Sequence, residues 1–406
     1  MVNVAILGFG VVGSGTAEVL SINKDSIKEK CGVEINLKKI LDLRDFPESP
    51  FASLVTHEAD DVFNDKDISI CVETIGGARI AYEYTKRALS NGITVVTSNK
   101  ELVSTHGVEL LKLAKENHCS YLYEAAVGGG IPIIRPLYRC LAANKIVKIA
   151  GIVNGTTNYI LSAMKNKGIS YEDALKQAQL NGYAEQNPSA DVDGIDAQRK
   201  LSILSTISLN GLYVAPSSIN ATGISALTLQ DIKFGSKINA SLKLIAYFEN
   251  KIGNKPIVYV APHYVKNNNL LASVEDVFNA VLVEGNCLGE SIFYGQGAGM
   301  LPTASAVCGD IVEAASNKNF ENDIRLWHES TDGDVILPYE DIAVSIIVRG
   351  PKDSADDLKE AFSGYDVKVL VDDGEDSAIS VRGIKHKDIE ERVSKVAGST
   401  WLHYLR

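Results

Sequence analysis

Apolar residues along the first third of the chain follow two alternating spacings. Short runs of apolar, mostly β-branched residues predict buried strands, and stretches with apolar positions three or four residues apart predict helices. The strands are predicted at 2–7, 35–41, 68–74, 93–97 and 121–123, and the helices include 80–89 and 102–116. Repeated strand–helix units predict a parallel, doubly wound α/β sheet, which binds ligands at the carboxyl ends of its strands.

The first predicted strand runs directly into the glycine motif Gly8-Phe9-Gly10-Val11-Val12-Gly13, and a helical pattern follows. Strand, GxGxxG and helix in this order form the context that a dinucleotide-binding fingerprint requires. Gly8 permits a tight turn, Gly10 lets the backbone approach the pyrophosphate, and Gly13 allows close packing of helix on strand. A plain glycine turn is the alternative, but the position after the first strand favours the dinucleotide.

Charged residues follow two of the predicted strands. Asp42 ends the second strand, and Arg44 lies just beyond it. An acid here binds the ribose 2′-hydroxyl of NAD, whereas an arginine can hold the 2′-phosphate of NADP, so the choice of dinucleotide stays open. Lys100 closes the strand at 93–97 and can reach the cofactor or the reacting centre. For all three residues, an ordinary charged surface position is the alternative.

Two loops in the middle of the chain offer oxygen ligands. Glu124 shortly precedes three consecutive glycines, and a carboxylate combined with backbone carbonyls suits a hard cation, although a glycine-rich turn is the simpler interpretation. Thr156 and Thr157 follow a strand predicted at 145–153. Either hydroxyl can cap the next helix or, beside a cofactor, bind a substrate.

A short segment, 182–200, gathers four acids and one lysine: Glu185, Asp191, Asp193, Asp196 and Lys200. The acids lie in a loop broken by glycine and proline, and the loop enters an apolar helix. Asp196 and Lys200 are four residues apart, so they lie on the same helix face. Such a pair can hold a small polar substrate and move a proton to or from it, whereas Asp193 is interpreted as an ordinary loop residue.

Residues from about 340 onward form a separate pattern. Strands are predicted at 342–348, 367–371 and 378–381, helices at 354–362 and 387–396, and a short final element at 401–405. This βαββαβ order resembles an ACT domain, a ferredoxin-like regulatory module. Arg349-Gly350-Pro351-Lys352 stands where that module has a different Pro-Gly turn. The tail is therefore expected either to bind an amino-acid effector or to serve in packing or dimerisation.

Composition sets limits on the class of protein. A chain of 406 residues is expected to hold two or three domains, and its net charge of −11 argues against nucleic acid as a partner. The six cysteines are scattered and suit reduced thiols of a cytoplasmic protein. No window approaches the ~20 apolar residues of a membrane span, so we expect a cytoplasmic protein with no membrane partner.

Several separated motifs, taken together, resemble homoserine dehydrogenase over roughly the first 315 residues. They are GFGVVG at 8–13, TSNKEL at 97–102, YEAAVGGGIPII at 123–134, GIVNGTTNYIL at 151–161, GYAE and DVDGIDAQRK within 182–200, and GQGAGMLPTASAV at 295–307. The resemblance implies an oxidoreductase that interconverts L-homoserine and L-aspartate 4-semialdehyde with NAD or NADP. Such an enzyme serves threonine, methionine and isoleucine biosynthesis.

The resemblance also implies roles for individual residues. Lys200 handles the alcohol proton, and Lys100 lies near the reacting carbon. The substrate contacts fall on Glu185, Asp196, Asp191 and Thr156. The cofactor contacts fall on Gly8, Phe9, Gly10, Val11, Val12, Gly13, Arg44, Lys100, Gly182 and Gly297. A monovalent, sodium-type cation is implied at Glu124 with the carbonyls of Val127, Gly129 and Ile131.

The resemblance and the element pattern together predict three domains, and the resemblance alone implies a homodimer. Residues 1–130 form a Rossmann-type dinucleotide-binding domain, and residues 131–315 form an α+β substrate-binding and dimerisation domain. Residues 295–315 can return to the first domain and cover the cofactor, or simply lead into a helix. Residues 340–406 form the ACT-like βαββαβ unit. An amino-acid effector is expected, if at all, at this C-terminal domain.

Overall fold

The computed structural model describes residues 1–251, 253–316 and 326–405. The chain forms two compact units, each built from separate segments. The first unit comprises Met1–Lys145, Ser202–Pro216 and Phe293–Gly333, and the second unit comprises Ile146–Leu201, Ser217–Ile292 and Asp334–Arg406. Each unit is described below by itself. No helix among the described residues is long and apolar enough to cross a membrane.

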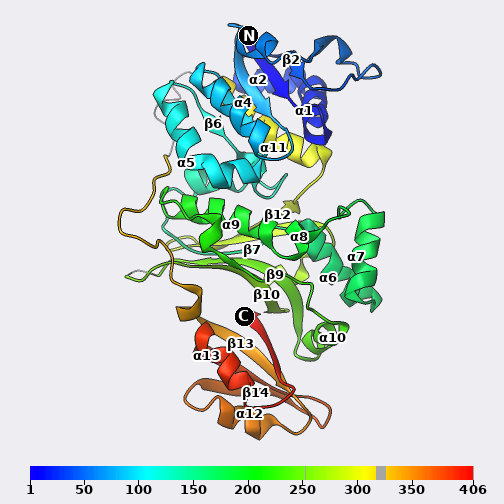
Figure 1. The fold of residues 1–406 in the computed structure, drawn as a ribbon, viewed down its shortest axis with the longest axis vertical. Helices are drawn as coiled ribbons and strands as arrows, with labels where there is room; N and C mark the ends of the chain where they lie inside the picture. The colour runs from blue at the N-terminus through cyan, green and yellow to red at the C-terminus, as the bar shows by residue number, and fades with distance from the viewer. Residues whose placement is uncertain (252, 317–325, 406) are drawn as a thin grey trace. The chain divides into compact units, whose positions relative to one another are not determined.

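The first unit contains a parallel sheet of six strands among the described residues, with the order β3-β2-β1-β4-β5-β6. Figure 1 shows helices packed around this sheet. The strands are β1 (Val2–Leu7), β2 (Ile35–Leu41), β3 (Val55–Thr56), β4 (Ile68–Glu73), β5 (Thr94–Thr97) and β6 (Tyr121–Leu122). Every neighbouring pair is parallel. This is the strand order of a dinucleotide-binding Rossmann sheet, so the predicted doubly wound α/β fold is confirmed.

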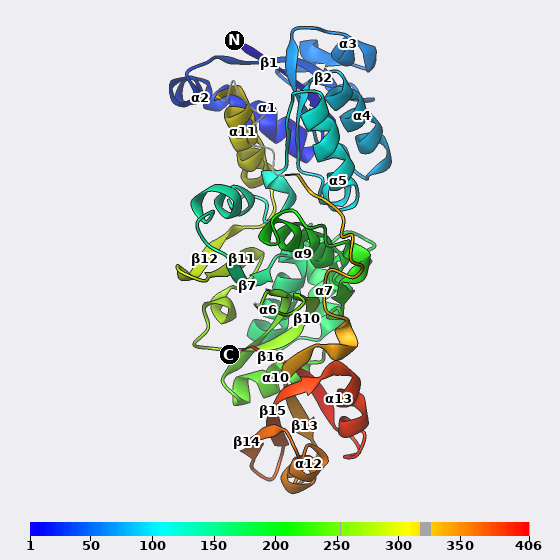
Figure 2. The same cartoon turned by 90° about the vertical axis from the view of Figure 1, so that its left-hand side faces the viewer.

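Helices from both ends of the chain cover this sheet. They are α1 (Val11–Ile22), α2 (Lys24–Cys31), α4 (Arg79–Ser90), α5 (Lys100–Glu116) and α11 (Met300–Ser316). Although α11 comes late in the sequence, it lies beside α1 (Figure 2). Val307 and Ile311 of α11 share a buried core with Ile6 of β1. A side chain at Gly15 would lie 2.8 Å from Met300 Cγ, so the glycine permits this close packing of the two helices.

The second unit is built around a long sheet, with the order β12-β11-β7-β9-β10-β16-β13-β15-β14 and β8 (Asn220–Ala221) paired to β10. The earlier strands are β7 (Ile146–Ile152), β9 (Ala240–Glu249), β10 (Ile257–Lys266), β11 (Phe278–Gly285) and β12 (Gly289–Gln296). Its helices are α6 (Gly155–Lys167), α7 (Tyr171–Leu180), α8 (Ser189–Val192), α9 (Ile195–Ser208) and α10 (Leu229–Lys237). The strand predicted at 145–153 is observed as β7, whereas β9, which lies between β7 and β10, was missed.

The C-terminal module completes that sheet. Its elements are β13 (Ala343–Gly350), α12 (Ala355–Ala361), β14 (Asp366–Asp372), β15 (Ser377–Lys385), α13 (His386–Val393) and β16 (Thr400–Leu405). The predicted βαββαβ sequence is thus observed, and the strand order β16-β13-β15-β14 is ferredoxin-like. Strand β16 also pairs in parallel with β10. Tyr259 and Ala261 of β10 share a core with Ile346 and Phe362 of the module, so module and sheet are packed as one body.

Three histidines lie together where β16 joins β10. The rings of His263 and His403 are 4.8 Å apart, and Nε2 of His403 is 3.2 Å from Nε2 of His386. His263 Nε2 is also 3.2 Å from the Tyr259 hydroxyl. Burial lowers the pKa of His263 to about 4 and that of His386 to about 4, and it holds the pKa of His403 well below its usual range. The joint therefore requires neutral imidazoles.

Acid is expected to weaken this joint. Each of the three histidines has a folded-state pKa below the unfolded value. For His263, the contribution to stability is therefore complete above about pH 6.5 and is lost as the pH falls through about 4. Replacing His263 with glutamine removes one such group. When the pH is lowered from 7 to 5, the free energy of unfolding of the native chain should fall by about 2 kcal/mol more than that of His263→Gln. Urea unfolding at both pH values measures this difference.

The exposed histidine His118 supplies a matched control. His118→Gln should keep the native pH dependence. An equal loss of unfolding free energy in the native and His263→Gln proteins would contradict the proposed acid sensitivity of the joint.

Candidate active site

The glycine turn of the first unit has the geometry that a dinucleotide requires. Gly8 has φ +90°, a left-handed conformation that favours glycine. A side chain at Gly13 would overlap the Gly8 carbonyl oxygen, whereas one at Gly10 would meet no atom within 4 Å. Gly10 precedes α1 and provides no side-chain cap. The turn thus offers space and the N-terminus of a helix to a pyrophosphate.

Asp42 and Arg44 form one ion-paired group instead of two independent ones. Asp42 Oδ2 accepts a 2.7 Å hydrogen bond from the Phe9 backbone N–H, which ties it to the glycine turn. Arg44 donates from Nε and Nη2 to the same carboxylate, each at 3.0 Å. Hydrogen bonding by Arg44 lowers the pKa of Asp42 to about 2. Asp42 is buried, but the Arg44 side chain is 63% exposed and accessible to a ligand.

A buried acid joins two loops at the carboxyl ends of β4 and β5. Glu73 accepts hydrogen bonds from the Ile75 backbone N–H at 2.7 Å and from the Thr97 hydroxyl at 2.6 Å. Burial raises the pKa of Glu73 to about 7. Asn99 caps α5 and donates to the Gly77 carbonyl at 2.7 Å, which links the same loops. Glu73 had no sequence signal beyond its place at the end of an apolar strand.

Lys100 does not close a strand, contrary to the sequence-based prediction. Strand β5 ends at Thr97, and Lys100 is the first residue of α5. The Asn99 side chain accepts a hydrogen bond from the Leu102 N–H, which places the start of the helix directly after Asn99. Lys100 still lies at the carboxyl-end edge of the sheet, where ligands of this fold bind.

Glu124 organises the glycine loop that follows it. Its carboxylate is buried and accepts three backbone hydrogen bonds, from Ile133 at 2.7 Å, Ile134 at 2.9 Å and Arg135 at 2.6 Å. Gly129 has φ +53°, and a side chain there would overlap the backbone of Gly297. The glycine loop at 128–130 and the loop at 295–299 therefore lie against each other. Burial raises the pKa of Glu124.

The cation ligands predicted from the resemblance, Glu124 and the carbonyls of Val127, Gly129 and Ile131, all belong to this one loop. Carboxylate Oε1 of Glu124 accepts two of its three hydrogen bonds and Oε2 accepts one. No hydrogen bond reaches the carbonyl oxygens of Val127, Gly129 or Ile131 from the residues that the structure describes. Within that same part of the chain, no group of three or more His, Cys, Asp or Glu could hold a metal ion. Any cation here would therefore depend on carbonyl oxygens.

The lysine–acid pair of the second unit forms as its spacing predicted. Lys200 Nζ donates to Asp196 Oδ2 at 2.7 Å and to the Val153 carbonyl at 2.6 Å. Lys200 is 9% exposed and Asp196 is 4% exposed. Asp196 lies in the first turn of α9, where the helix dipole stabilises a negative charge. The arrangement keeps an ammonium group in a largely water-free position beside one carboxylate.

Asn154 connects this pair to a second acid, and the sequence pattern did not single it out. Its amide Nδ2 donates to Asp191 Oδ1 at 2.7 Å and to Asp196 Oδ2 at 2.9 Å. The predicted helix cap at Thr156 or Thr157 is wrong, because Asn154 caps α6 by accepting from the Thr157 N–H. Asparagine is a preferred cap residue, and that preference was the available signal. Burial, and then Asp196, raise the pKa of Asp191.

The other residues predicted in this region are Thr156 and Glu185 for the substrate, Gly182 for the cofactor, and Asp193 as a loop residue. Thr156 donates from its hydroxyl to the Tyr183 carbonyl at 2.6 Å. Gly182 has φ +74° and ends the turn after α7. Glu185 is exposed, and no hydrogen bond of its carboxylate is found within the described residues. Asp193 is also exposed, in agreement with its interpretation as a loop residue.

These features define a class of protein. A Rossmann sheet with a glycine turn at its first strand indicates a dinucleotide-binding oxidoreductase, and the buried lysine beside two acids is suited to proton transfer on a polar substrate. Two family models match the chain. The homoserine dehydrogenase NAD binding domain matches residues 8–124, and homoserine dehydrogenase matches residues 132–312. The chain belongs to the homoserine dehydrogenase family.

Individual relatives resemble the chain along most of its length. A homoserine dehydrogenase of Pseudomonas aeruginosa is 34% identical over 408 residues, covering 97% of this chain and 94% of the relative. The crystal structure of a homoserine dehydrogenase from Thiobacillus denitrificans matches with a TM-score of 0.88 and 33% identity, covering 99% and 98% of the two chains. A hyperthermophilic archaeal homoserine dehydrogenase in complex with NADPH matches with a TM-score of 0.65 and 31% identity, covering 77% and 97%.

Proposed function

We propose that the chain oxidises L-homoserine reversibly to L-aspartate 4-semialdehyde with NAD or NADP, and that Lys200 exchanges the proton of the alcohol. The observation that carries the assignment of Lys200 is its buried ammonium, 2.7 Å from Asp196 and linked through Asn154 to Asp191. The bound nicotinamide supplies or accepts the hydride. When the aldehyde is reduced, Lys200 gives a proton to the oxygen on which negative charge develops, and in the oxidation its neutral amine takes the proton back.

Asp191 and Asp196 are suited to hold the ammonium group of the substrate. Both carboxylates are bonded to one amide and therefore have fixed positions. Glu185 is exposed, so we assign it an outer contact to the substrate, and Thr156, whose hydroxyl donates to the Tyr183 carbonyl, is assigned a further contact. Lys100 is assigned to catalysis by resemblance. The homodimer stays a prediction from the resemblance, and the cytoplasmic location stays a prediction from the sequence composition.

The dinucleotide is assigned to the glycine turn of the first unit. Gly10 leaves the space that a pyrophosphate needs, and Gly13 permits close packing below it. An archaeal relative has been solved with NADPH, which supports a phosphorylated dinucleotide in this family. In this chain Arg44 is largely exposed and paired with Asp42. Arg44 would bind a 2′-phosphate, and Asp42 would bind a 2′-hydroxyl.

The loop at Glu124 fits a sodium-type cation. An ionised carboxylate offers about four lone-pair sites, and three are used by backbone N–H groups, so one remains. The carbonyls of Val127, Gly129 and Ile131 would supply the other oxygens. Oxygen ligands of this kind suit a hard cation. The ion would neutralise the buried charge of Glu124 and hold the glycine loop in place.

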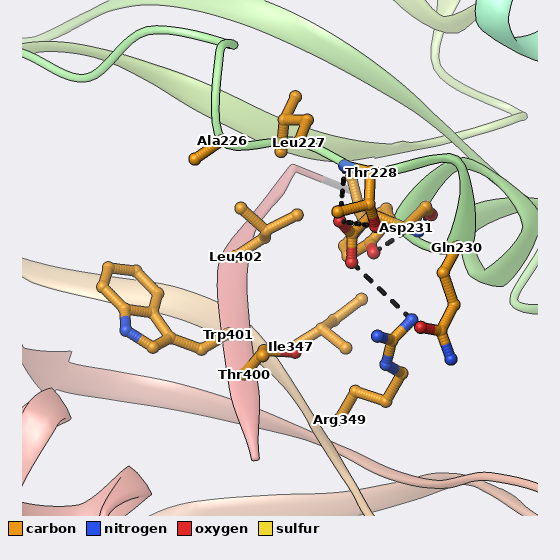
Figure 3. A pocket seen from close by; sticks show the side chains of 11 residues that line it. Ala226, Leu227, Thr228, Gln230, Asp231, Ile347, Arg349, Thr400, Trp401 and Leu402 are labelled. Atoms are coloured by element: carbon orange, nitrogen blue, oxygen red, sulfur yellow. Dashed lines mark hydrogen bonds and ion pairs between the residues drawn. The ribbon is translucent and has the colours of Figure 1, made fainter. Parts of the chain in front are cut away.

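A cavity in the second unit supports an amino-acid effector at the C-terminal module. It has a volume of about 410 Å³ and is lined from one side by Thr228 and Asp231 and from the other by Arg349 and Trp401 (Figure 3). Arg349 Nη1 lies 3.6 Å from Asp231 Oδ1, and this buried atom has no hydrogen-bond partner among the described residues. The carboxylate of an amino acid would satisfy Arg349, and its ammonium group would face Asp231.

Lys200→Arg should separate proton transfer from ion pairing. Arginine keeps the positive charge beside Asp196 but does not lose its proton at working pH. We expect kcat for homoserine oxidation to fall about 10²- to 10⁴-fold, with the fold and the affinity for the dinucleotide unchanged. Steady-state kinetics and dinucleotide titration measure these quantities. Lys200→Met, which removes the charge, is the companion variant, and near-normal turnover in Lys200→Arg would refute the role of Lys200.

Arg44→Ala should distinguish the two dinucleotides. If Arg44 binds the 2′-phosphate, the KM for NADP should rise about 10- to 100-fold, because a charge-assisted hydrogen bond is lost, while the KM for NAD changes little. Lys38→Ala is the control, since it removes a positive charge from β2, the strand that precedes Arg44, and its ion-pair partners are Asp65 and Asp67. Equal changes for NAD and NADP in Arg44→Ala would rule out this role.

Arg349→Met should abolish any response to an effector without changing basal turnover. The test measures homoserine oxidation with added L-threonine, L-methionine or L-isoleucine. We expect at least one amino acid to inhibit the native enzyme and its inhibition constant to rise about 10-fold or more in the variant. Lys352→Met, an exposed position in the next turn, is the control. If none of the three inhibits, or if Arg349→Met responds normally, the tail is a packing module.

A further inference from the structure

Two consecutive residues directly after β7 hydrogen-bond to Lys200, Asp191 and Asp196. The carbonyl oxygen of Val153 accepts from Lys200 at 2.6 Å. The next side chain, Asn154, donates to Asp191 at 2.7 Å and to Asp196 at 2.9 Å. The acids belong to α8 and α9, which come about forty residues later in the sequence. The end of one strand therefore fixes three charges that arrive from other elements.

The orientation of the Asn154 amide is determined by its own helix. Its Oδ1 accepts from the Thr157 backbone N–H at 2.8 Å and from the Thr157 hydroxyl at 2.9 Å. A rotated amide would direct its NH₂ group at that N–H and its oxygen at the two carboxylates, so neither side could form a hydrogen bond. Asn154 is 5% exposed and makes all four hydrogen bonds that its amide allows. Both amide hydrogens must therefore face the two carboxylates.

The two carboxylates need such a donor, because they repel each other. Burial and the neighbouring Asp196 already raise the pKa of Asp191, and the hydrogen bond from Asn154 opposes that rise. The charged groups that face Asp191 are Asp196 and Lys200, both on α9. Lys200 is bonded to Asp196, whereas Asn154 is bonded to both acids. One neutral amide thus sets the spacing of two negative charges.

We propose that Asn154 is a positioning residue for substrate binding, which holds Asp191 and Asp196 as a paired receptor for the ammonium group of the substrate. The inference rests on the proposed function, because it assumes that an amino-acid substrate binds at these acids. Asn154 itself does not exchange the proton. Its loss should therefore raise the KM for homoserine much more than it lowers kcat, and should leave the KM for the dinucleotide unchanged.

Asn154→Asp tests this role with little change of shape. Aspartate is as good a helix cap as asparagine, so the hydrogen bond from the Thr157 N–H is kept. A carboxylate oxygen replaces the amide NH₂ group, so both hydrogen bonds to the acids are lost and a third negative charge is added beside them. The KM for L-homoserine should rise about 10- to 100-fold, the size of a lost hydrogen bond to a charged group. The KM for L-homoserine should also begin to increase at a higher pH than in the native enzyme when the solution is acidified, because Asp191 takes up a proton more readily.

Ser170→Ala is the matched control for a purely structural cap. Ser170 caps α7 in the same unit by accepting from the Asp173 N–H, and no hydrogen bond joins it to Asp191 or Asp196 among the described residues. This variant should lower the melting temperature but keep the native KM and its pH profile. The inference is overturned if Asn154→Asp keeps the native KM and pH profile, or if Ser170→Ala raises the KM equally.

The same experiment distinguishes failure of this inference from failure of the proposed function. If the native protein neither oxidises L-homoserine nor binds it in a calorimetric titration, the proposed function fails, and the inference fails with it. If the native protein is active and Asn154→Asp behaves like it, only the role of Asn154 is refuted.

Discussion

The buried ammonium of Lys200 is the constraint on which the rest of the substrate cluster depends. An ammonium group removed from water is strongly destabilised unless it is paired and hydrogen-bonded. Asp196, one helical turn away, supplies the opposite charge, and the Val153 carbonyl supplies a further acceptor. Asp191 adds a second negative charge that the single lysine does not neutralise by direct contact. The cluster is therefore ready to accept another cation, and the ammonium group of an amino-acid substrate is one.

Each unit contributes a different part of the chemistry. In the first unit, the carboxyl ends of parallel strands place the glycine turn, the Asp42–Arg44 pair and the buried Glu73 where this fold binds a dinucleotide. In the second unit, β7 pairs antiparallel with β11, and the residues directly after β7 hydrogen-bond to the acids. The C-terminal module joins the same sheet through the parallel pair of β16 and β10. Because the module shares its core with β10, an effector in its cavity would act on a strand of the same sheet.

Local rules explain which features could be predicted from the sequence. The glycine motif depends on neighbouring residues, and the Asp196–Lys200 pair depends on a spacing of four in one helix. The βαββαβ order of the tail also follows from local periodicity. The comparisons with known proteins confirm the family but leave the roles of individual residues to experiment.

Features that depend on distant contacts could not be predicted in this way. Asn154 matters because α8 and α9 return to it, and its own neighbours give no sign of that. Strand β9 carries Lys243 at a fully buried position, so its apolar pattern is interrupted and the strand was missed. Lys100 was assigned to a strand end because the cap at Asn99 was not recognised.

A crystal structure with L-homoserine and a dinucleotide tests the central claim most directly. The account predicts the substrate hydroxyl within about 3.2 Å of Lys200 Nζ and the substrate ammonium at Asp191 and Asp196; a substrate bound away from Lys200 would contradict it.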